Sequence, residues 1–135
     1  MILSLKAGSK LYLNGAVIKV DRKVNLELIN DAVFILDIHV MQTRDATTPL
    51  RQLYFVLQSI LMEPGDTAPS KEFVLEVLAG LNATFENREV LDGLQLVGQQ
   101  IAFGRSFEAM KLIRLLFSIE DQILLRHGNV SSRAA

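Results

Sequence analysis

The amino-terminal part of the chain alternates apolar and polar residues with a period of two, which is the pattern of half-buried strands. In the stretch 9–29, SKLYLNGAVIKVDRKVNLELI, two apolar runs flank Asn14-Gly15. A type I′ turn needs positive φ at both central residues, and Asn and Gly tolerate this best, so the stretch predicts a β-hairpin. With the runs on either side, the pattern predicts about five short strands, near residues 3–6, 10–13, 16–20, 24–29 and 33–41.

The connections between these expected strands are short. Parallel neighbours need a crossover of about a dozen residues or more, whereas antiparallel neighbours can be joined by a tight turn. The pattern therefore predicts an antiparallel β-meander, in which each strand pairs with the next one along the chain.

After residue 46 the apolar residues recur every three or four positions, which is typical of amphipathic helices. Thr48 can cap the first helix, and Pro49 fits its first position because the amide that proline lacks would be unpaired there. Candidate caps for three more helices are Ser70, Asn87 and Ser106. Gly104 is the stop signal of the third helix.

The predicted fold class is α+β, with an antiparallel β-meander of about five strands followed by a bundle of about four helices. We expect a β module over residues 1–46, a helical module over 47–128 and a frayed tail over 129–135. Gly93 and Gly98 lie inside the third expected helix. Each either weakens it by roughly 1 kcal/mol relative to alanine or marks a close contact between helices.

Composition restricts the possible classes of protein. The chain contains no cysteine, which excludes disulfides and thiolate metal sites and fits a reducing compartment. Its amino terminus lacks the leader pattern of a signal peptide. The apolar runs are shorter than the roughly 20 residues that cross a bilayer. We therefore expect a cytoplasmic protein with no membrane partner.

Residues suited to catalysis are scarce. His39 and His127 are about ninety residues apart, and neither has a second ligand at metal spacing. No phosphate-cradling glycine loop and no GxSxG nucleophile elbow is present. The four aspartates of residues 1–46 stand singly, at turns or strand edges, and turn chemistry explains Asp21 and Asp31. We expect no enzyme activity, no metal and no cofactor.

Basic residues gather in the amino-terminal part, although the net charge of the chain is only −1. Residues 1–30 carry five basic and two acidic side chains, a local net of +3, whereas residues 61–135 carry seven basic and ten acidic ones, a net of −3. The ordinary interpretation is a solvated sheet face. The functional interpretation is a positive surface with an aromatic ring, which can contact RNA phosphates and stack an unpaired base.

On the functional interpretation, each candidate residue has a role assigned from its charge and position. We expect phosphate contacts from Lys10, Lys19, Arg22 and Lys23. Tyr12, which shares a strand face with Lys10, is the candidate for base stacking. The outlying positive residues are Arg44 and Arg51.

Two pieces of sequence point to a known family. They are LNGAVIKVDRKVNLELIND at 13–31 and ATTPLRQLYFVLQ at 46–58, within a longer similar run over 3–64. The chain resembles the flagellar biosynthesis regulators of the FlbT family. The helical half matches more loosely, mainly through NATFENREVLDGL and SFEAMKLIRLLFSIE.

The resemblance implies a function that spacing alone does not. FlbT-like proteins act after transcription, by associating with the 5′ untranslated leader of flagellin mRNA and promoting its degradation. For this chain we expect loss of the transcript to follow from blocked translation or from nuclease access. Some members are regarded as activators, so the sign of the regulation does not carry over. The family supplies no residue-level site.

Two other kinds of partner stay open at the level of sequence. The resemblance also associates the family with FlaF, so the chain could be an adaptor or chaperone that binds FlaF or flagellin and affects RNA indirectly. Exposed Phe or Met on helices 71–84 or 107–118 would favour this alternative, because contiguous exposed apolar surface marks interaction sites. Open edges of the meander could also pair between two copies of the chain.

Overall fold

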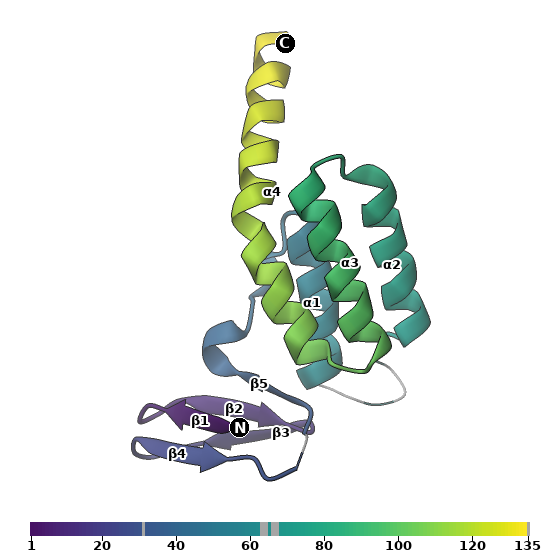
Figure 1. Cartoon of the computed structure of the whole chain (residues 1–135). Helices are drawn as coiled ribbons and strands as arrows, with labels where there is room; N and C mark the ends of the chain where they lie inside the picture. Colours follow the sequence, from purple (N-terminus) through teal and green to yellow (C-terminus); the bar gives the residue numbers. More distant parts are fainter. Residues whose placement is uncertain (31, 63–64, 66–67, 135) are drawn as a thin grey trace.

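Two kinds of architecture follow one another along the chain (Figure 1). The computed structural model describes residues 1–30, 32–62, 65 and 68–134, with side chains as far as residue 126. Within these residues, five short strands precede four α-helices, so the predicted class and order of elements are confirmed. The strands are β1 (Ile2–Leu5), β2 (Lys10–Leu13), β3 (Ala16–Lys19), β4 (Val24–Glu27) and β5 (Phe34–Leu36).

The strands form two antiparallel sheets in place of one meander. One sheet has the order β1-β4 and the other the order β3-β2-β5. Among the described strands, β2 and β3 alone pair with their neighbour in sequence. Their turn has positive φ at Asn14 (50°) and Gly15 (84°), so the predicted hairpin is confirmed.

The apolar faces of the two sheets explain why the meander prediction was wrong. Leu3 and Leu5 of β1 form a buried cluster with Leu11 of β2 and Phe34 of β5. Pairing β1 with β4 lets the small sheet lay this apolar face on the larger one, so both faces leave water. In a single meander, one face would have to be covered entirely by helices.

The expected strand over 33–41 is also wrong beyond Leu36. The chain continues as two 3₁₀ turns, η1 (Asp37–His39) and η2 (Thr43–Asp45). Side chains of the first helix form hydrogen bonds with backbone amide and carbonyl groups of this segment. The Gln58 side chain accepts a hydrogen bond from the Met41 amide (2.6 Å) and donates one to the Met41 carbonyl (2.8 Å), and the Tyr54 hydroxyl donates to the His39 carbonyl. Backbone groups that have such partners need no neighbouring strand.

The helices are α1 (Pro49–Met62), α2 (Lys71–Thr84), α3 (Arg88–Ala102) and α4 (Ser106–Ala134). Three of the predicted caps are confirmed by hydrogen bonds from amides three residues further on, to Thr48 (3.3 Å), Ser70 (3.1 Å) and Asn87 (3.1 Å). The fourth is not, because Ser106 is the first residue inside α4. There the Ala109 amide donates to the Arg105 carbonyl, which puts Arg105 at the cap.

Glycines shape the helical module at two kinds of position. Gly104 has φ 75° and comes directly after Phe103, the C-cap residue of α3, which confirms the predicted stop signal. A Cβ at Gly93 would lie 2.8 Å from both methyl carbons of Leu116, and one at Gly98 would lie 3.0 Å from a methyl carbon of Leu78. Both glycines therefore mark close contacts between helices, which is one of the two interpretations that the sequence allowed.

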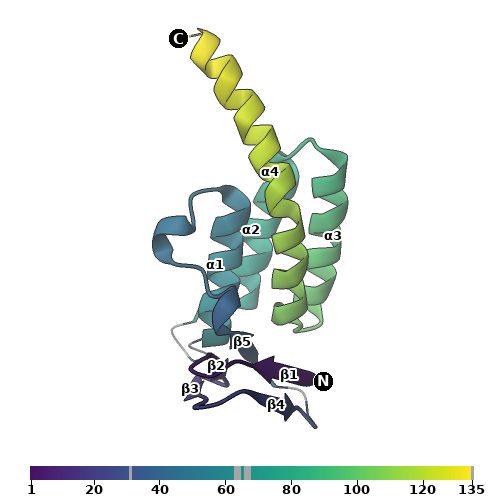
Figure 2. The same ribbon diagram turned by 90° about the vertical axis from the view of Figure 1, so that its left-hand side faces the viewer.

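The molecule has three layers, the β1-β4 sheet, the β3-β2-β5 sheet and the helices. Figures 1 and 2 show the strands at one end of the helical bundle, with β5 nearest to the helices and β4 farthest away. Tyr12 and Ile35 pack against the helical core, and the ring of Phe107 lies 4.7 Å from that of Phe34, between centroids. The boundary predicted at residue 46 and the fraying of residues 129–135 stay predictions.

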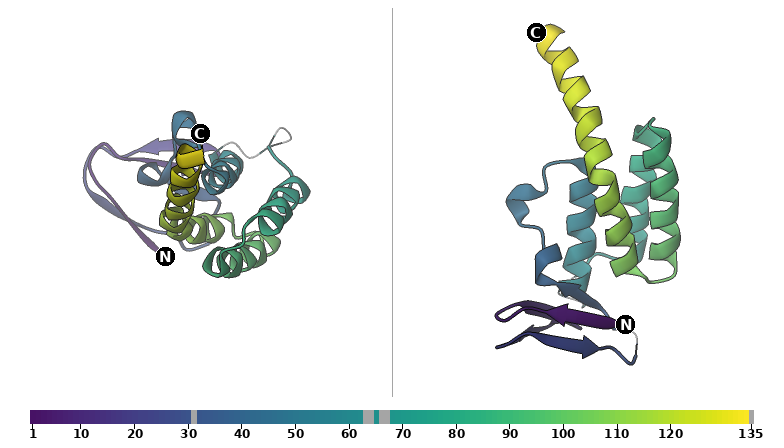
Figure 3. Two further views of the ribbon diagram at one scale, coloured as in Figure 1. Left: turned by 90° about the horizontal axis from the view of Figure 1, so that it is seen from above. Right: turned by 60° about the vertical axis from the view of Figure 1, so that its left-hand side comes forward.

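Helix α4 is the longest element, with 29 residues. Figure 3 shows that it packs beside α1 and α3 through its first half and extends beyond them through its second, so that the two chain termini lie far apart. None of the helices in the described part of the chain is both long and apolar enough to cross a membrane.

Candidate nucleic-acid interface

Most of the basic residues singled out in the sequence meet at one end of the sheets. Lys10 and Lys19 are directly opposite each other in the β2-β3 register, at the end remote from the hairpin turn. The turn after β1 lies against the turn after β3, because the Gly8 amide donates to the Val20 carbonyl (2.7 Å) and the Val20 amide donates to the Ser9 carbonyl (3.1 Å). We call the cluster formed in this way the basic end, consisting of Lys6, Lys10, Lys19, Arg22 and Lys23.

Side chains of the basic end are exposed and carry little negative charge among them. The Arg22 guanidinium donates two hydrogen bonds to the Asp21 carboxylate, at 3.1 and 3.0 Å. This pairing lowers the pKa of Asp21 below its ordinary value. Both side chains are nearly four-fifths exposed, and ion pairs in such positions contribute little to stability. A stronger anion can therefore compete for Arg22 at little cost.

The opposition of Lys10 and Lys19 runs against the usual preference of a sheet. Like charges directly across two strands destabilise the pair, typically by a few tenths of a kcal/mol. No carboxylate among the described residues forms an ion pair with either lysine. Such a violation of a local rule is expected at functional sites more than elsewhere.

Tyr12 shares the strand face of Lys10, as the alternation predicted, but it is half-buried. Its side chain packs against the helical core and lines a hollow of about 390 Å³ with Phe55, Met41 and Met62, among others. A base that stacked on Tyr12 would have to enter this hollow.

The two outlying arginines do not join the basic end. Arg44 is exposed in η2. Arg51 lies where α1 meets α4, where its guanidinium donates to both carboxylate oxygens of Asp121 (2.7 and 3.0 Å) and sits 4.5 Å from the ring centroid of Phe117. The hydrogen bond to Asp121 raises the pKa of Arg51. Arg51 is thus occupied by contacts within the protein, and we leave it out of the candidate surface.

Glu120, a buried carboxylate beside Arg51, was not predicted from the sequence. Glu120 of α4 is fully buried, and its Oε2 accepts a hydrogen bond from the Leu50 amide (2.8 Å) in the first turn of α1. Its Oε1 lies 3.6 Å from Nη1 of Arg51. A carboxylate is favourable at a helix amino terminus, so Glu120 ties α4 to α1.

His39, which lies in η1, is held near two basic residues of α4. Its Nδ1 is buried without a hydrogen-bond partner among the described residues. Burial, and then the positive charges of Arg114 and Lys111, lower the pKa of the His39 imidazole. These two cations were not predicted as site residues, because about seventy residues separate them from η1. The side chain of His127 lies outside the described part.

A groove opens between the sheets and the turn that joins α3 to α4. It has a volume of about 860 Å³, and its lining includes Met1, Ile29, Val33 and Phe103. Their side chains are exposed, Ile29 and Phe103 by four-fifths or more. Of the residues proposed to favour a protein partner, Phe73 is half-exposed, Phe107 is partly buried and Met110 is buried. The apolar exposure is thus greater at the groove than on α2 or α4 at these positions.

Comparison with known proteins agrees with the resemblance seen in the sequence. The family model described as "Flagellar protein FlbT" matches residues 1–124. A probable flagellum biosynthesis repressor protein FlbT of Chelativorans sp. (strain BNC1) is 51% identical over 122 residues, which cover 90% of this chain and 84% of the relative. No solved structure matches the chain.

Two further relatives carry the same description. The probable flagellum biosynthesis repressor protein FlbT 2 of Bradyrhizobium diazoefficiens is 48% identical over 124 residues, covering 92% of this chain and 91% of the relative. The corresponding protein of Brucella ovis is 47% identical over 122 residues, covering 90% and 80%. The class that these relatives define is that of flagellar regulators. The chain described here belongs to the FlbT family.

Proposed function

We propose that this chain regulates flagellum biosynthesis in the cytoplasm by binding the 5′ untranslated leader of flagellin mRNA. Its curated relatives are named repressors of flagellum biosynthesis. In the proposed mechanism no bond is made or broken by the protein. Binding leads to loss of the transcript by blocking translation or by giving a nuclease access.

The observation that carries the proposal is the opposition of Lys10 and Lys19 beside the Arg22-Lys23 turn. A phosphate between the two lysines offsets their mutual repulsion. Binding an anion therefore removes an unfavourable interaction that is present in the free protein. Arg22 can exchange its exposed carboxylate for a phosphate, which its planar guanidinium fits with two hydrogen bonds. Single-stranded segments are the expected target, because sequence-specific RNA recognition mostly reads unpaired bases.

Binding to RNA without help is the first thing to test. Purified protein is titrated into labelled leader RNA alone, and separately into a candidate protein partner alone, at about 0.15 M salt. We expect the leader to be bound in the absence of any partner. Binding to the partner but not to the leader would overturn the proposal.

The groove favours a second candidate function, that of an adaptor for FlaF or flagellin. A groove whose lining includes exposed Ile29 and Phe103 would leave water on contact with an apolar segment. On this alternative, replacing Phe103 by serine abolishes partner binding and leaves leader binding unchanged. Equal partner binding by Phe103→Ser and wild-type protein would remove the groove from the interface.

A further inference from the structure

Lys10 and Lys19 lie on the face of their sheet that is turned toward the helices. Alternate residues of a strand share a face, so Lys10 lies on the same side of β2 as Tyr12, and Lys19 lies on that side of β3 because it is directly opposite Lys10. Tyr12 packs against the helical core, while Leu11 packs against the other sheet. The two lysines therefore lie at the end of this sheet that is remote from the hairpin turn, on its helix-facing side.

The register of β5 brings η1 to the same end of the sheet. Leu36 is opposite Leu11, so Asp37 and the η1 turn begin beside Lys10. His39 in this turn lies close enough to Lys111 and Arg114 for their charges to act on it. Arg114 is fixed there, because its Nη1 donates to the Tyr54 hydroxyl (3.3 Å), which in turn donates to the His39 carbonyl.

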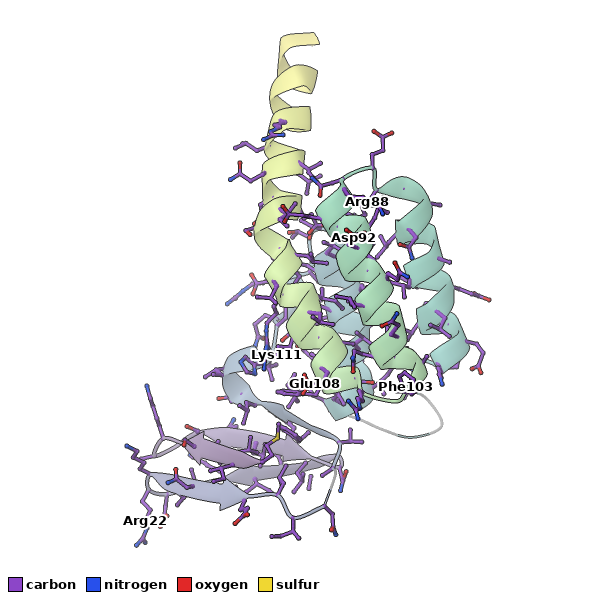
Figure 4. All side chains as sticks on the ribbon, in the orientation of Figure 1. Arg22, Arg88, Asp92, Phe103, Glu108 and Lys111 are labelled. Carbon is purple, nitrogen blue, oxygen red and sulfur yellow. The ribbon has the colours of Figure 1, made fainter. Side chains whose placement is uncertain are left out.

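Lys111 is the freer of the two α4 cations. It is exposed, and no carboxylate among the described residues forms an ion pair with it or with Arg114. Figure 4 shows Lys111 on the part of α4 that lies above the sheets, with Glu108 nearby and Arg22 at the tip of the β module below. Acidic groups in this region include Asp21, which is paired with Arg22, Asp37, beside Lys10, and Glu108, one helical turn from Lys111.

We infer that the polyanion-binding surface is composite and that Lys111 and Arg114 of α4 extend the basic end into one positive face shared by the β and helical modules. This inference rests on the proposed function and adds a second module to it. The ligand is a single RNA strand whose backbone leaves the basic end and runs along α4 over several phosphates. The affinity for a ligand bound in this way depends on the relative position of the two modules as well as on the charge of each.

The test is the salt dependence of leader-RNA binding by Lys111→Ala, with Arg88→Ala as the matched control. Arg88 is also an exposed cation of the helical module, but it lies at the end of α3 remote from the sheets (Figure 4). Both substitutions change the net charge by the same amount. A phosphate contact with a single strand contributes about 0.7 to the slope of log K against log salt, so its loss weakens binding roughly fivefold at 0.1 M salt.

Lys111→Ala is expected to lose roughly fivefold in affinity and about 0.7 in slope, with Arg88→Ala close to wild type. Equal affinity and slope for the two variants, with Arg22→Ala/Lys23→Ala still weakened, would overturn the composite surface and leave the proposed function standing. A leader that is bound equally well by all variants, the double one included, would overturn both. Thermal unfolding checks that every variant is folded. Lys111→Arg keeps the positive charge and is expected to bind the leader as tightly as wild type.

Discussion

Two arginine–aspartate pairs of this molecule each form two hydrogen bonds, through Nε and Nη2 in Arg22 and through Nη1 and Nη2 in Arg51, but their surroundings are opposite. Arg22 and Asp21 are adjacent in sequence and nearly four-fifths exposed, whereas Arg51 and Asp121 are seventy residues apart and join α1 to α4. Arg51 also stacks on Phe117 and lies near a buried carboxylate. The comparison shows that a bidentate pair does not define a role by itself. Its exposure and the elements that it connects decide whether it stabilises the fold or is free to exchange partners.

The largest effect is expected when Glu120 is removed from the α1–α4 joint. Glu120→Ala leaves the Leu50 amide without its partner and opens a cavity in the core. Removing one partner of a buried charged pair costs about 3–5 kcal/mol, and we expect about 3 kcal/mol, measured by urea unfolding. Gln122→Ala, at an exposed position on the same helix, is the control and should be nearly neutral. A loss below about 0.5 kcal/mol would show that the joint carries no stability.

Replacing Arg51 should destabilise the protein more than replacing Arg22. Arg51→Ala removes a two-point ion pair and a cation–π contact and should cost about 1–2 kcal/mol. Arg22→Ala removes a solvent-exposed pair and should leave the unfolding midpoint unchanged. Urea unfolding of both variants under one condition makes the comparison. Equal losses would contradict the different roles that we assign to them.

The pH dependence of stability gives a smaller effect at the same joint. Arg51 lowers the pKa of Asp121, so the charged carboxylate favours the folded state. This contribution is complete above the ordinary pKa of about 3.8 and is lost as pH falls through the lowered pKa. Arg51→Ala should therefore lose less stability than wild type between pH 4 and pH 2 (roughly the range of carboxylate titration). Parallel curves for the two proteins would contradict the linkage.

The local structure of the chain was readable from the sequence because local chemistry determines it. Asn14-Gly15 specifies its turn by backbone preference, and Thr48, Ser70 and Asn87 cap helices with their own side chains. The excess of basic residues in the amino-terminal part was also visible in the sequence, whereas their meeting at one end of the sheets depends on the contact between the turns after β1 and β3.

The arrangement of the two sheets could not be read in the same way. Short turns allow a meander, but the choice of β4 as partner of β1 depends on which apolar face covers Leu11 and Phe34. The end of β5 depends on Gln58 and Tyr54, which lie in a helix that follows it. The proximity of Lys111 to η1 has the same cause, since contacts between distant segments leave no periodic signal in either one.

The central claim is that the basic end binds RNA phosphates. The most direct measurement is the slope of log K against log salt for leader binding, compared between wild type and Arg22→Ala/Lys23→Ala. We predict that the double variant binds more weakly and that its slope is shallower by about 1.4, since two single-strand phosphate contacts contribute about 0.7 each. Unchanged affinity together with an unchanged slope would contradict the account and remove the basic end from the interface.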